Sequence, residues 1–283
     1  MEAEGETLVE SLNGIVSRVP GCVGVAFVSD RDTVLINNGV RFPMMSVFKL
    51  HEALAVCNKM ERRNNSLDSL IRVAPEELDK ETWSPMLKEY GDSAFNISVG
   101  ELIRYALKLS DNNASNILFN RIVSPQESEE YVRSFAADTS FSMRWREQDM
   151  KRNHDLAYAN YTSPIAVALL IRNLFTGDTP SLRDGKFVRN VLTEVTTGQD
   201  RLGAPIQERK NVLFAHKTGS GYRNNHGELA AHNDVGFFRL EDGKDYSLAV
   251  LIRDFHGPET EASAIIAEIS RLIFNHVSNE KYF

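Results

Sequence analysis

The stretch 228–252, ELAAHNDVGFFRLEDGKDYSLAVLI, holds two β-prone runs on either side of the turn-forming residues 241–243. A third β-prone run covers 212–216, and a helical pattern over 260–276 closes the chain. The last part of the sequence therefore predicts three strands followed by a helix.

The N-terminal end of the sequence also predicts a helix and strands. Apolar residues recur at helical spacing over 6–19 and stop at the Pro-Gly pair that follows. Two short β-prone runs, 22–28 and 33–36, then flank a turn-like segment at 29–32. This arrangement predicts a hairpin near the start of the chain.

Between these ends, residues 46–192 show mainly helical periodicity and almost no strand-like runs. We expect helices at 47–60, 98–110, 113–122, 128–135, 164–175 and 186–193. The whole pattern predicts an α/β (α+β) fold. Residues 1–45 and 197–283 would build one α/β domain, with an antiparallel sheet flanked by the N- and C-terminal helices, and residues 46–196 would form an inserted all-α domain.

Length and charge narrow the range of functions. At 283 residues, the chain can bury a full core without metals or disulfides. Its 32 basic and 39 acidic residues, with no Lys/Arg run longer than two, argue against nucleic-acid binding. No apolar stretch approaches the roughly 18 to 20 residues that span a bilayer, so no membrane segment is expected. The start of the chain is acidic where a secretory signal would be basic and then apolar, so an exported protein would be represented here by its processed form.

Cys22 and Cys57 are the two cysteines of the chain and could form one disulfide. Because Cys22 lies in a predicted strand and Cys57 in a predicted helix, we expect two small buried thiols instead. Neither has the spacing of a metal ligand, and no metal site is predicted.

Three short motifs carry candidate chemistry, and the first is Ser-Val-Phe-Lys at 46–49. The helical pattern that follows it puts Ser46 at a helix N-terminus, where unpaired N–H groups and the helix dipole favour developing negative charge. Lys49 lies one turn later on the same face and could take the proton of the serine. An ordinary helix start with a solvated lysine is the alternative for this motif alone.

The second motif is Ser-Asp-Asn at 110–112, directly after a helical pattern. Its three short polar side chains favour a turn over continuation of the helix. Ser110 could relay a proton to a leaving nitrogen, and Asn112 could hydrogen-bond a substrate amide. The same residues could also cap the helix that begins near Asn113.

The third motif, Lys-Thr-Gly-Ser-Gly at 217–221, ends a predicted strand. Lys217 and the hydroxyls of Thr218 and Ser220 would suit a substrate carboxylate. Gly219 allows the close backbone approach that a carbonyl under attack requires. A plain strand with a glycine-rich turn is the alternative for this motif alone.

The order of these motifs resembles that of class A serine β-lactamases, and the resemblance covers nearly the whole chain. The runs SVFKLHEALAVC (46–57), SDNNASN (110–116) and HKTGSGY (216–222) are most similar to the CfxA-type cephalosporinases. The resemblance implies a β-lactamase/D,D-peptidase-like fold with the active site between the α/β and all-α domains. It also implies a small-molecule β-lactam substrate, no cofactor, a monomer, and a periplasmic or secreted location in a bacterium.

The resemblance further implies a glutamate on an omega-shaped loop, which activates the deacylating water. Glu147 lies at the matching place, with Asp149 as the competing carboxylate. Two departures from the family pattern affect this loop. Lys151 stands where many members carry an asparagine that helps to hold the water, and Trp145 and Asn160 stand where others carry an Arg–Asp pair that closes the loop. Local hydrogen bonds would have to hold the loop instead.

A third departure concerns the substrate carboxylate. Many members carry an arginine where this chain has His226, whereas Arg201, in the run TGQDR (197–201), resembles the alternative used in other branches. We therefore expect Arg201 to bind the carboxylate. Trp83 matches the aromatic residue that flanks the substrate entrance, although a packed core position is a close alternative.

On this resemblance, Ser46 would attack the lactam carbonyl after losing its proton to Lys49, Glu147 or both. The backbone N–H groups of Ser46 and Ser220 would form the oxyanion hole. The serine of the second motif and Lys217 would assist ring opening, and Glu147 would then activate water. Two alternatives lack rapid deacylation: a penicillin-binding D,D-peptidase, and a β-lactam sensor domain that is acylated once. The sequence does not rank the penicillins and cephalosporins as substrates.

Overall fold

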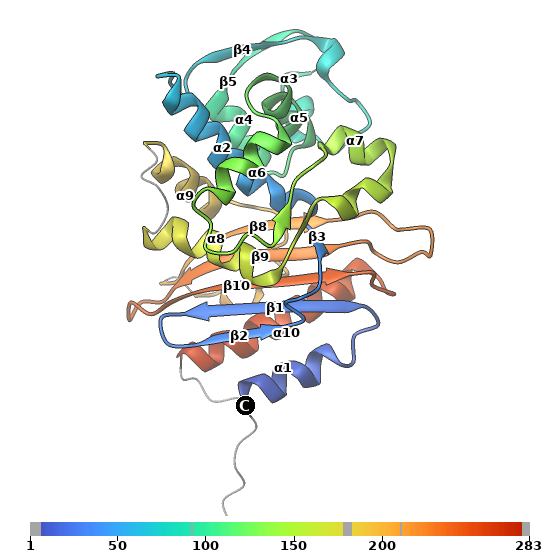
Figure 1. Cartoon of the computed structure of the whole chain (residues 1–283), viewed down its shortest axis with the longest axis vertical. Coiled ribbons are helices and arrows are strands. Elements are labelled where there is room, and N and C mark those ends of the chain that lie inside the picture. The colour runs from blue at the N-terminus through green and yellow to red at the C-terminus, as the bar shows by residue number, and fades with distance from the viewer. Residues whose placement is uncertain (1–6, 92, 178–182, 210, 279–283) are drawn as a thin grey trace, which may run out of the picture.

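The computed structural model describes residues 7–91, 93–177, 183–209 and 211–278. Its largest sheet has five antiparallel strands in the order β2-β1-β10-β9-β8. These strands are β1 (Cys22–Ser29), β2 (Thr33–Ile36), β8 (Leu213–Ser220), β9 (His232–Arg239) and β10 (Asp245–Arg253). The predicted hairpin and the three predicted C-terminal strands are thus confirmed. The two ends of the chain meet in the middle of the sheet, where β1 pairs with β10 (Figure 1).

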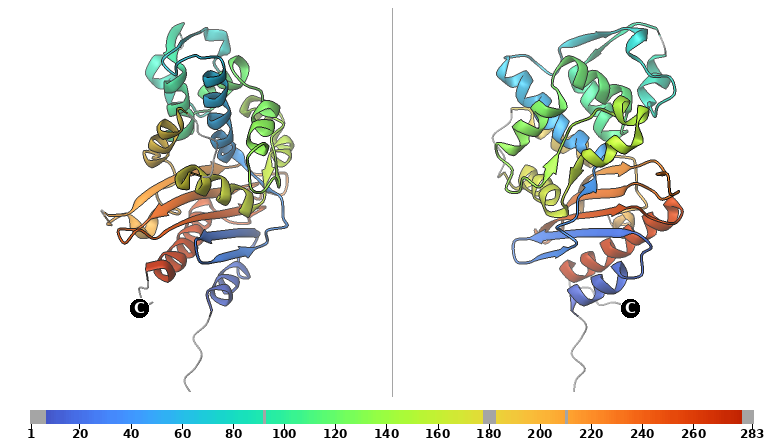
Figure 2. Two further views of the ribbon diagram at one scale, coloured as in Figure 1. Left: turned by 60° about the vertical axis from the view of Figure 1, so that its left-hand side comes forward. Right: turned by 45° about the vertical axis from the view of Figure 1, so that its right-hand side comes forward.

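Helices cover both faces of this sheet, as the views in Figure 2 show. The helices α1 (Leu8–Val16) and α10 (Glu259–Ser278) lie on one face, and α8 (Pro164–Thr176) lies on the other. Side chains alternate between the faces along each strand. Val250 on β10 packs in the cluster with α1 and α10, whereas its neighbour Leu251 packs in the cluster of the helical region. The central strands therefore contribute to two cores.

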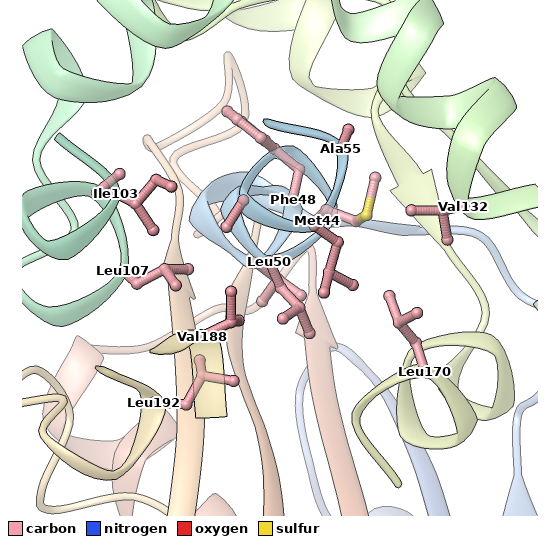
Figure 3. Packing of buried hydrophobic residues seen from close by; sticks show 14 of the residues in the cluster. Met44, Phe48, Leu50, Ala55, Ile103, Leu107, Val132, Leu170, Val188 and Leu192 are labelled. Atoms are coloured by element: carbon pink, nitrogen blue, oxygen red, sulfur yellow. The ribbon is translucent and has the colours of Figure 1, made fainter. Parts of the chain in front are cut away.

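The helical region is centred on α2 (Phe48–Arg62). Figure 3 shows Phe48 and Leu50 of this helix among apolar side chains from its neighbours. The other helices are α3 (Pro85–Tyr90), α4 (Val99–Lys108), α5 (Asn112–Arg121), α6 (Pro125–Arg133), α7 (Glu147–Arg152) and α9 (Gly185–Thr193). All six helices predicted in this part are confirmed, whereas α3 and α7 were not predicted because six residues are too few to establish a periodic pattern.

Short strands and 3-10 turns complete the fold. The strands are β3 (Phe42–Pro43), β4 (Leu70–Val73), β5 (Phe95–Ser98), β6 (Phe141–Ser142) and β7 (Tyr161–Thr162), and the turns are η1 (Met45–Val47), η2 (Pro75–Glu77), η3 (His154–Ala159) and η4 (Ala204–Ile206). β7 pairs with both β3 and β6. This pairing closes the neck of the loop between β6 and β7, and it joins that neck to the segment that leads into η1.

Three further expectations concern the chain as a whole. The predicted domain boundaries stay a prediction, and α8, from the middle of the chain, covers the sheet. Cys22 and Cys57 are both free thiols in the structure. The expected burial is confirmed for Cys57 and is wrong for Cys22, which is partly exposed at the start of β1. Among the described residues, no helix combines the length and the apolar composition needed to cross a membrane.

Gly24 on β1 tests the packing between the sheet and the helical region. A Cβ at this position would lie 2.5 Å from Cε2 of Phe42 and 2.7 Å from Cγ of Pro164. We expect Gly24→Ala to lower the free energy of unfolding by about 1 to 3 kcal/mol because it overpacks the core. Chemical denaturation measures this loss.

Gly14 provides the control, since it lies in the exposed part of α1, where a Cβ would meet no atom within 4 Å. Gly14→Ala should raise stability by about 0.5 to 1 kcal/mol through helix propensity. Equal effects of the two substitutions would contradict the packing described here.

Candidate active site

Ser46 lies in η1, the 3-10 turn that leads directly into α2, so it stands at the start of a helix as predicted. The preceding residue, Met45, has a φ of 45°, a left-handed conformation that is strained for a residue other than glycine. Asn233 on β9 anchors this turn by donating from its side-chain amide to the carbonyl of Pro43 at 2.8 Å. The turn is thus strained and tied to the sheet.

Ser46, Lys49 and Glu147 contact one another pairwise. Lys49 Nζ lies 3.0 Å from Ser46 Oγ and 3.0 Å from Glu147 Oε1, and Ser46 Oγ donates to Glu147 Oε1 at 3.1 Å. Lys49 also donates to the carbonyl of Ser110 at 2.9 Å and to Asn112 Oδ1 at 2.7 Å. Lys49 and Glu147 are both buried. Two proton-accepting groups therefore lie within hydrogen-bond distance of one serine hydroxyl, the arrangement that activates a serine nucleophile.

Ser110 and Asp111 lie in the turn between α4 and α5, and Asn112 is the first residue of α5. Asp111 caps α5 by accepting from the backbone N–H of Ala114 at 2.9 Å, and it also accepts from the N–H of Met86 at 2.7 Å. Ser110 has a φ of 57°, again in the left-handed region. The capping alternative is therefore correct, and the capped turn brings Ser110 and Asn112 to Lys49.

Lys217 on β8 points to the helical region, because it shares the strand face of Ala215 in that cluster. Its Nζ donates to Ser110 Oγ at 3.0 Å. Burial and then the charge of Lys49 lower the pKa of Lys217 well below its ordinary value, while the carboxylate of Asp234 opposes this shift. The second and third motifs thus meet through one hydrogen bond.

The next residues of β8 approach the nucleophile turn and the segment before η4. A Cβ at Gly219 would lie 2.4 Å from the carbonyl oxygen of Met44, so only glycine allows β8 to come this close to η1. On the opposite strand face, the hydroxyls of Thr218 and Thr197 lie 2.6 Å apart. These contacts bring the backbone around Ser220 beside Ser46.

Arg201 lies next to Ser220, to whose Oγ its Nη2 donates at 2.7 Å. Its Nη1 donates to the carbonyl of Asn233 at 2.8 Å, while its buried Nε has no hydrogen-bond partner among the described residues. The guanidinium is therefore held beside β8, and its Nε–H has no partner among the described residues. His226 lies in the exposed turn between β8 and β9.

Trp83 is 56% exposed, so the alternative of a packed core tryptophan is wrong. Its indole N–H donates to the carbonyl of Leu109 at 2.9 Å, and its own carbonyl accepts from the N–H of Asn112 at 3.0 Å. The neighbouring Thr82 accepts from the Asn112 amide at 2.9 Å. The exposed ring therefore stands on a segment that contacts the second motif directly.

Asn160 closes the loop that carries Glu147. Its Oδ1 accepts from the N–H groups of Arg144 at 2.7 Å and Trp145 at 3.0 Å, and its amide donates to the carbonyl of Trp145 at 2.7 Å. Its own carbonyl accepts from the N–H of Met44 at 2.8 Å. A buried asparagine and backbone groups thus make the closure for which other members use an Arg–Asp pair.

Lys151 and Asp149, the two other residues of α7 considered in the sequence analysis, each bind a partner outside the cluster of Ser46, Lys49 and Glu147. Lys151 pairs with Asp79, with Nζ–O distances of 2.7 and 2.8 Å, and this ion pair ties α7 to the segment after η2. Asp149 accepts from Arg146 Nε at 2.8 Å and from the Arg146 N–H at 3.2 Å. Of the two candidate carboxylates, Glu147 is the one in contact with Ser46.

Several residues of this site did not stand out in the sequence. Asn233 and Asp234 follow His232 at the start of β9, and these three consecutive polar residues before an apolar run were the available signal. Asp234 binds His216 Nδ1 at 2.9 Å beneath the third motif. Nothing in the sequence around Asp79 pointed to a role, because that role depends on its ion pair with the distant Lys151. No group of three or more His, Cys, Asp or Glu side chains in the described part of the chain is arranged to hold a metal ion.

The chain and its fold match known proteins. The family model of the Beta-lactamase enzyme family matches residues 7–277. This chain belongs to that β-lactamase family. It is 43% identical to a β-lactamase of Phocaeicola vulgatus over 269 residues, which cover 95% of this chain and 84% of the relative.

Solved structures agree with this assignment. A class A β-lactamase from Bacteroides cellulosilyticus has a TM-score of 0.89 and 31% identity, covering 96% of this chain and 98% of that one. The TLA-3 extended-spectrum β-lactamase has a TM-score of 0.90 and 30% identity, covering 95% and 98%. The predictions of a class A serine β-lactamase and of its fold are therefore confirmed, whereas the closeness to the CfxA type stays a prediction.

Asn160 allows a test of how this β-lactamase holds its loop. Asn160→Ala leaves two backbone N–H groups and one carbonyl without their partner, and each buried unpaired group costs about 1 to 3 kcal/mol. We expect a lower melting temperature and slower deacylation, measured by thermal denaturation and by the lifetime of the acyl-enzyme.

Asn153→Ala is the matched control on the same loop, because Asn153 is exposed and its side chain accepts from the N–H of its near neighbour Asp155 at 3.1 Å. It should change both quantities little. If Asn160→Ala deacylated as fast as the parent, Asn160 would not be needed to close the loop that carries Glu147.

Proposed function

We propose that this class A β-lactamase opens the lactam ring of penicillins and cephalosporins through an acyl-enzyme on Ser46, and thereby gives its bacterium resistance to these antibiotics. The mutual contact of Ser46, Lys49 and Glu147 carries the proposal. The family assignment favours a hydrolase over a D,D-peptidase or a sensor domain.

In acylation, Ser46 Oγ attacks the lactam carbonyl and gives its proton to Lys49 or Glu147, which both lie within hydrogen-bond distance. The developing oxyanion is bound by the backbone N–H groups of Ser46 and Ser220. The tight approach at Gly219 supports this pairing, since it brings the two backbone segments together.

Ring opening requires a proton at the lactam nitrogen. Ser110 is the donor, and the contact of its hydroxyl with Lys217 supports this role. The lowered pKa of Lys217 suits a group that shares a proton with this hydroxyl. In deacylation, Glu147 takes a proton from a water molecule, and the water oxygen attacks the ester carbonyl. The bond between the acyl group and Ser46 Oγ then breaks, and Glu147 returns the proton to Oγ.

Substrate recognition is assigned to the groups around these residues. Arg201, Thr218 and Ser220 bind the substrate carboxylate, Asn112 binds the acyl amide, and Trp83 flanks the entrance. The partly unused guanidinium of Arg201 supports its role. A preference for cephalosporins, a monomeric state and a periplasmic or secreted location are further parts of this proposal.

Glu147→Gln separates the two steps of the reaction. The variant keeps the size of the side chain but removes its basicity, so water activation should fail while Lys49 still supports acylation. We expect turnover of a chromogenic cephalosporin to fall by about a hundredfold to ten-thousandfold. Intact-protein mass spectrometry should show an acyl-enzyme that persists for minutes.

Two variants calibrate this experiment. Asp149→Asn should leave turnover within a few-fold of the parent, because Asp149 binds Arg146. Ser46→Ala should abolish the covalent adduct. If Asp149→Asn trapped the acyl-enzyme and Glu147→Gln turned over normally, the roles of the two carboxylates would be exchanged.

Arg201→Ala tests the carboxylate site. A charge-assisted contact exists both before and during reaction, so its loss should raise KM more than it lowers kcat. We expect a loss of about 1.5 to 3 kcal/mol in transition-state stabilisation, measured as kcat/KM. His226→Ala should have little effect because His226 lies in an exposed turn. The reverse result for these two variants would move the carboxylate partner to His226.

A further inference from the structure

Glu52 is a fully buried glutamate on α2, one turn after Lys49. Its Oε2 accepts from Ser115 Oγ on α5 at 2.8 Å. Its Oε1 is buried and has no hydrogen-bond partner among the described residues. None of the proposed catalytic steps uses this carboxyl group, although burying a polar atom without a partner is costly.

The contact between Glu52 and Ser115 lies one helical turn away from the contact between Lys49 and Asn112 in the active site. Lys49 on α2 donates to Asn112 on α5, and one turn further along both helices Ser115 donates to Glu52. The same two helices are thus bridged twice, at successive turns and on the same faces. The first bridge belongs to the proposed catalytic cluster, and the second lies directly behind it.

The surroundings of Glu52 favour its neutral form. Burial raises the pKa of Glu52 well above its ordinary value, and the charge of Glu147 adds to this effect. The hydrogen bond from Ser115 and the charge of Lys49 oppose it. An ionised Glu52 would repel the carboxylate of Glu147.

We propose that Glu52 is a positioning residue, whose protonated carboxyl group fixes α5 against α2 one turn behind the contact between Lys49 and Asn112. The proposal rests on the roles proposed above for Lys49 and Asn112. An apolar side chain would fill the same space, but it would leave Ser115 without its partner and the two helices without a directional contact.

The first experiment tests the neutral form through the pH dependence of unfolding. A neutral Glu52 keeps a proton that the unfolded chain releases above a pH of about 4.3. The parent should therefore lose stability relative to Glu52→Gln as the pH rises, by up to about tenfold in the folding equilibrium constant per pH unit, until Glu52 itself ionises. A constant difference between the two proteins above pH 5 would overturn the proposal.

Glu129→Gln is the matched control, since Glu129 is a buried glutamate on α6. Although its burial acts in the opposite direction, hydrogen bonds from Met143 and Arg133 lower the pKa of Glu129. Its carboxylate is ionised in both states above pH 5, so the difference from the parent should be constant there.

The second experiment tests positioning. Glu52→Gln keeps a neutral hydrogen-bonding group and should retain kcat/KM for a chromogenic cephalosporin within about threefold. Glu52→Leu should fold with stability at least equal to that of the parent at pH 8, yet kcat/KM and the rate of penicillin labelling should fall by tenfold to a hundredfold because the catalytic contact is displaced.

A double-mutant cycle then assigns the effect to the bridge. Ser115→Ala should lower kcat/KM in the same direction, and Glu52→Leu with Ser115→Ala should be no slower than Glu52→Leu alone. Parent-like kcat/KM for Glu52→Leu, or additive losses in the double variant, would overturn the positioning role. Failure of the proposed function can be told apart from failure of the role of Glu52. If Ser46 were not the nucleophile, Ser46→Ala would still form a penicillin adduct, and the difference between the parent and Glu52→Gln in the pH dependence of unfolding would stay as expected.

Discussion

The structure around the site depends on the burial of one lysine amino group. Lys49 is fully buried, and a polar group removed from water is tolerated only when it is hydrogen-bonded. Its Nζ contacts four oxygen atoms, from Ser46, Ser110, Asn112 and Glu147. These atoms come from η1, from the turn before α5 together with the first residue of α5, and from α7. The lysine therefore requires three separate segments to meet at one point.

A second buried lysine connects this cluster to the sheet. Lys217 reaches Ser110 from β8, and Asp234 on the adjacent strand lies near its charge. Asp234 also binds His216, so the strand pair β8–β9 carries a buried polar layer behind the third motif.

The loop from β6 to β7 must hold Glu147 in this cluster, and it does so from several sides. The β6–β7 pairing and Asn160 close its neck, and Lys151 ties α7 to Asp79. At its far end, the His154 ring stacks on Tyr222 just after β8, with 3.7 Å between the ring centroids. Distributed contacts thus replace the single ion pair of other members. Lys151 serves the loop in this arrangement, because its ammonium group is engaged by Asp79.

Much of this protein could be predicted from its sequence, because the deciding signals are local. Hydrophobic periodicity is set by neighbouring residues, and it correctly predicted the five strands of the largest sheet and the longer helices. The three motifs carry their residue types within a few positions, so the members of the cluster could be chosen in advance. The contacts within the cluster depended on tertiary structure. Asp79, Asn233 and Glu52 are distant in sequence from their hydrogen-bond partners, which are Lys151, the carbonyl of Pro43, and Ser115. Only the packing of α2, α5, α7 and β9 brings these partners within hydrogen-bond distance.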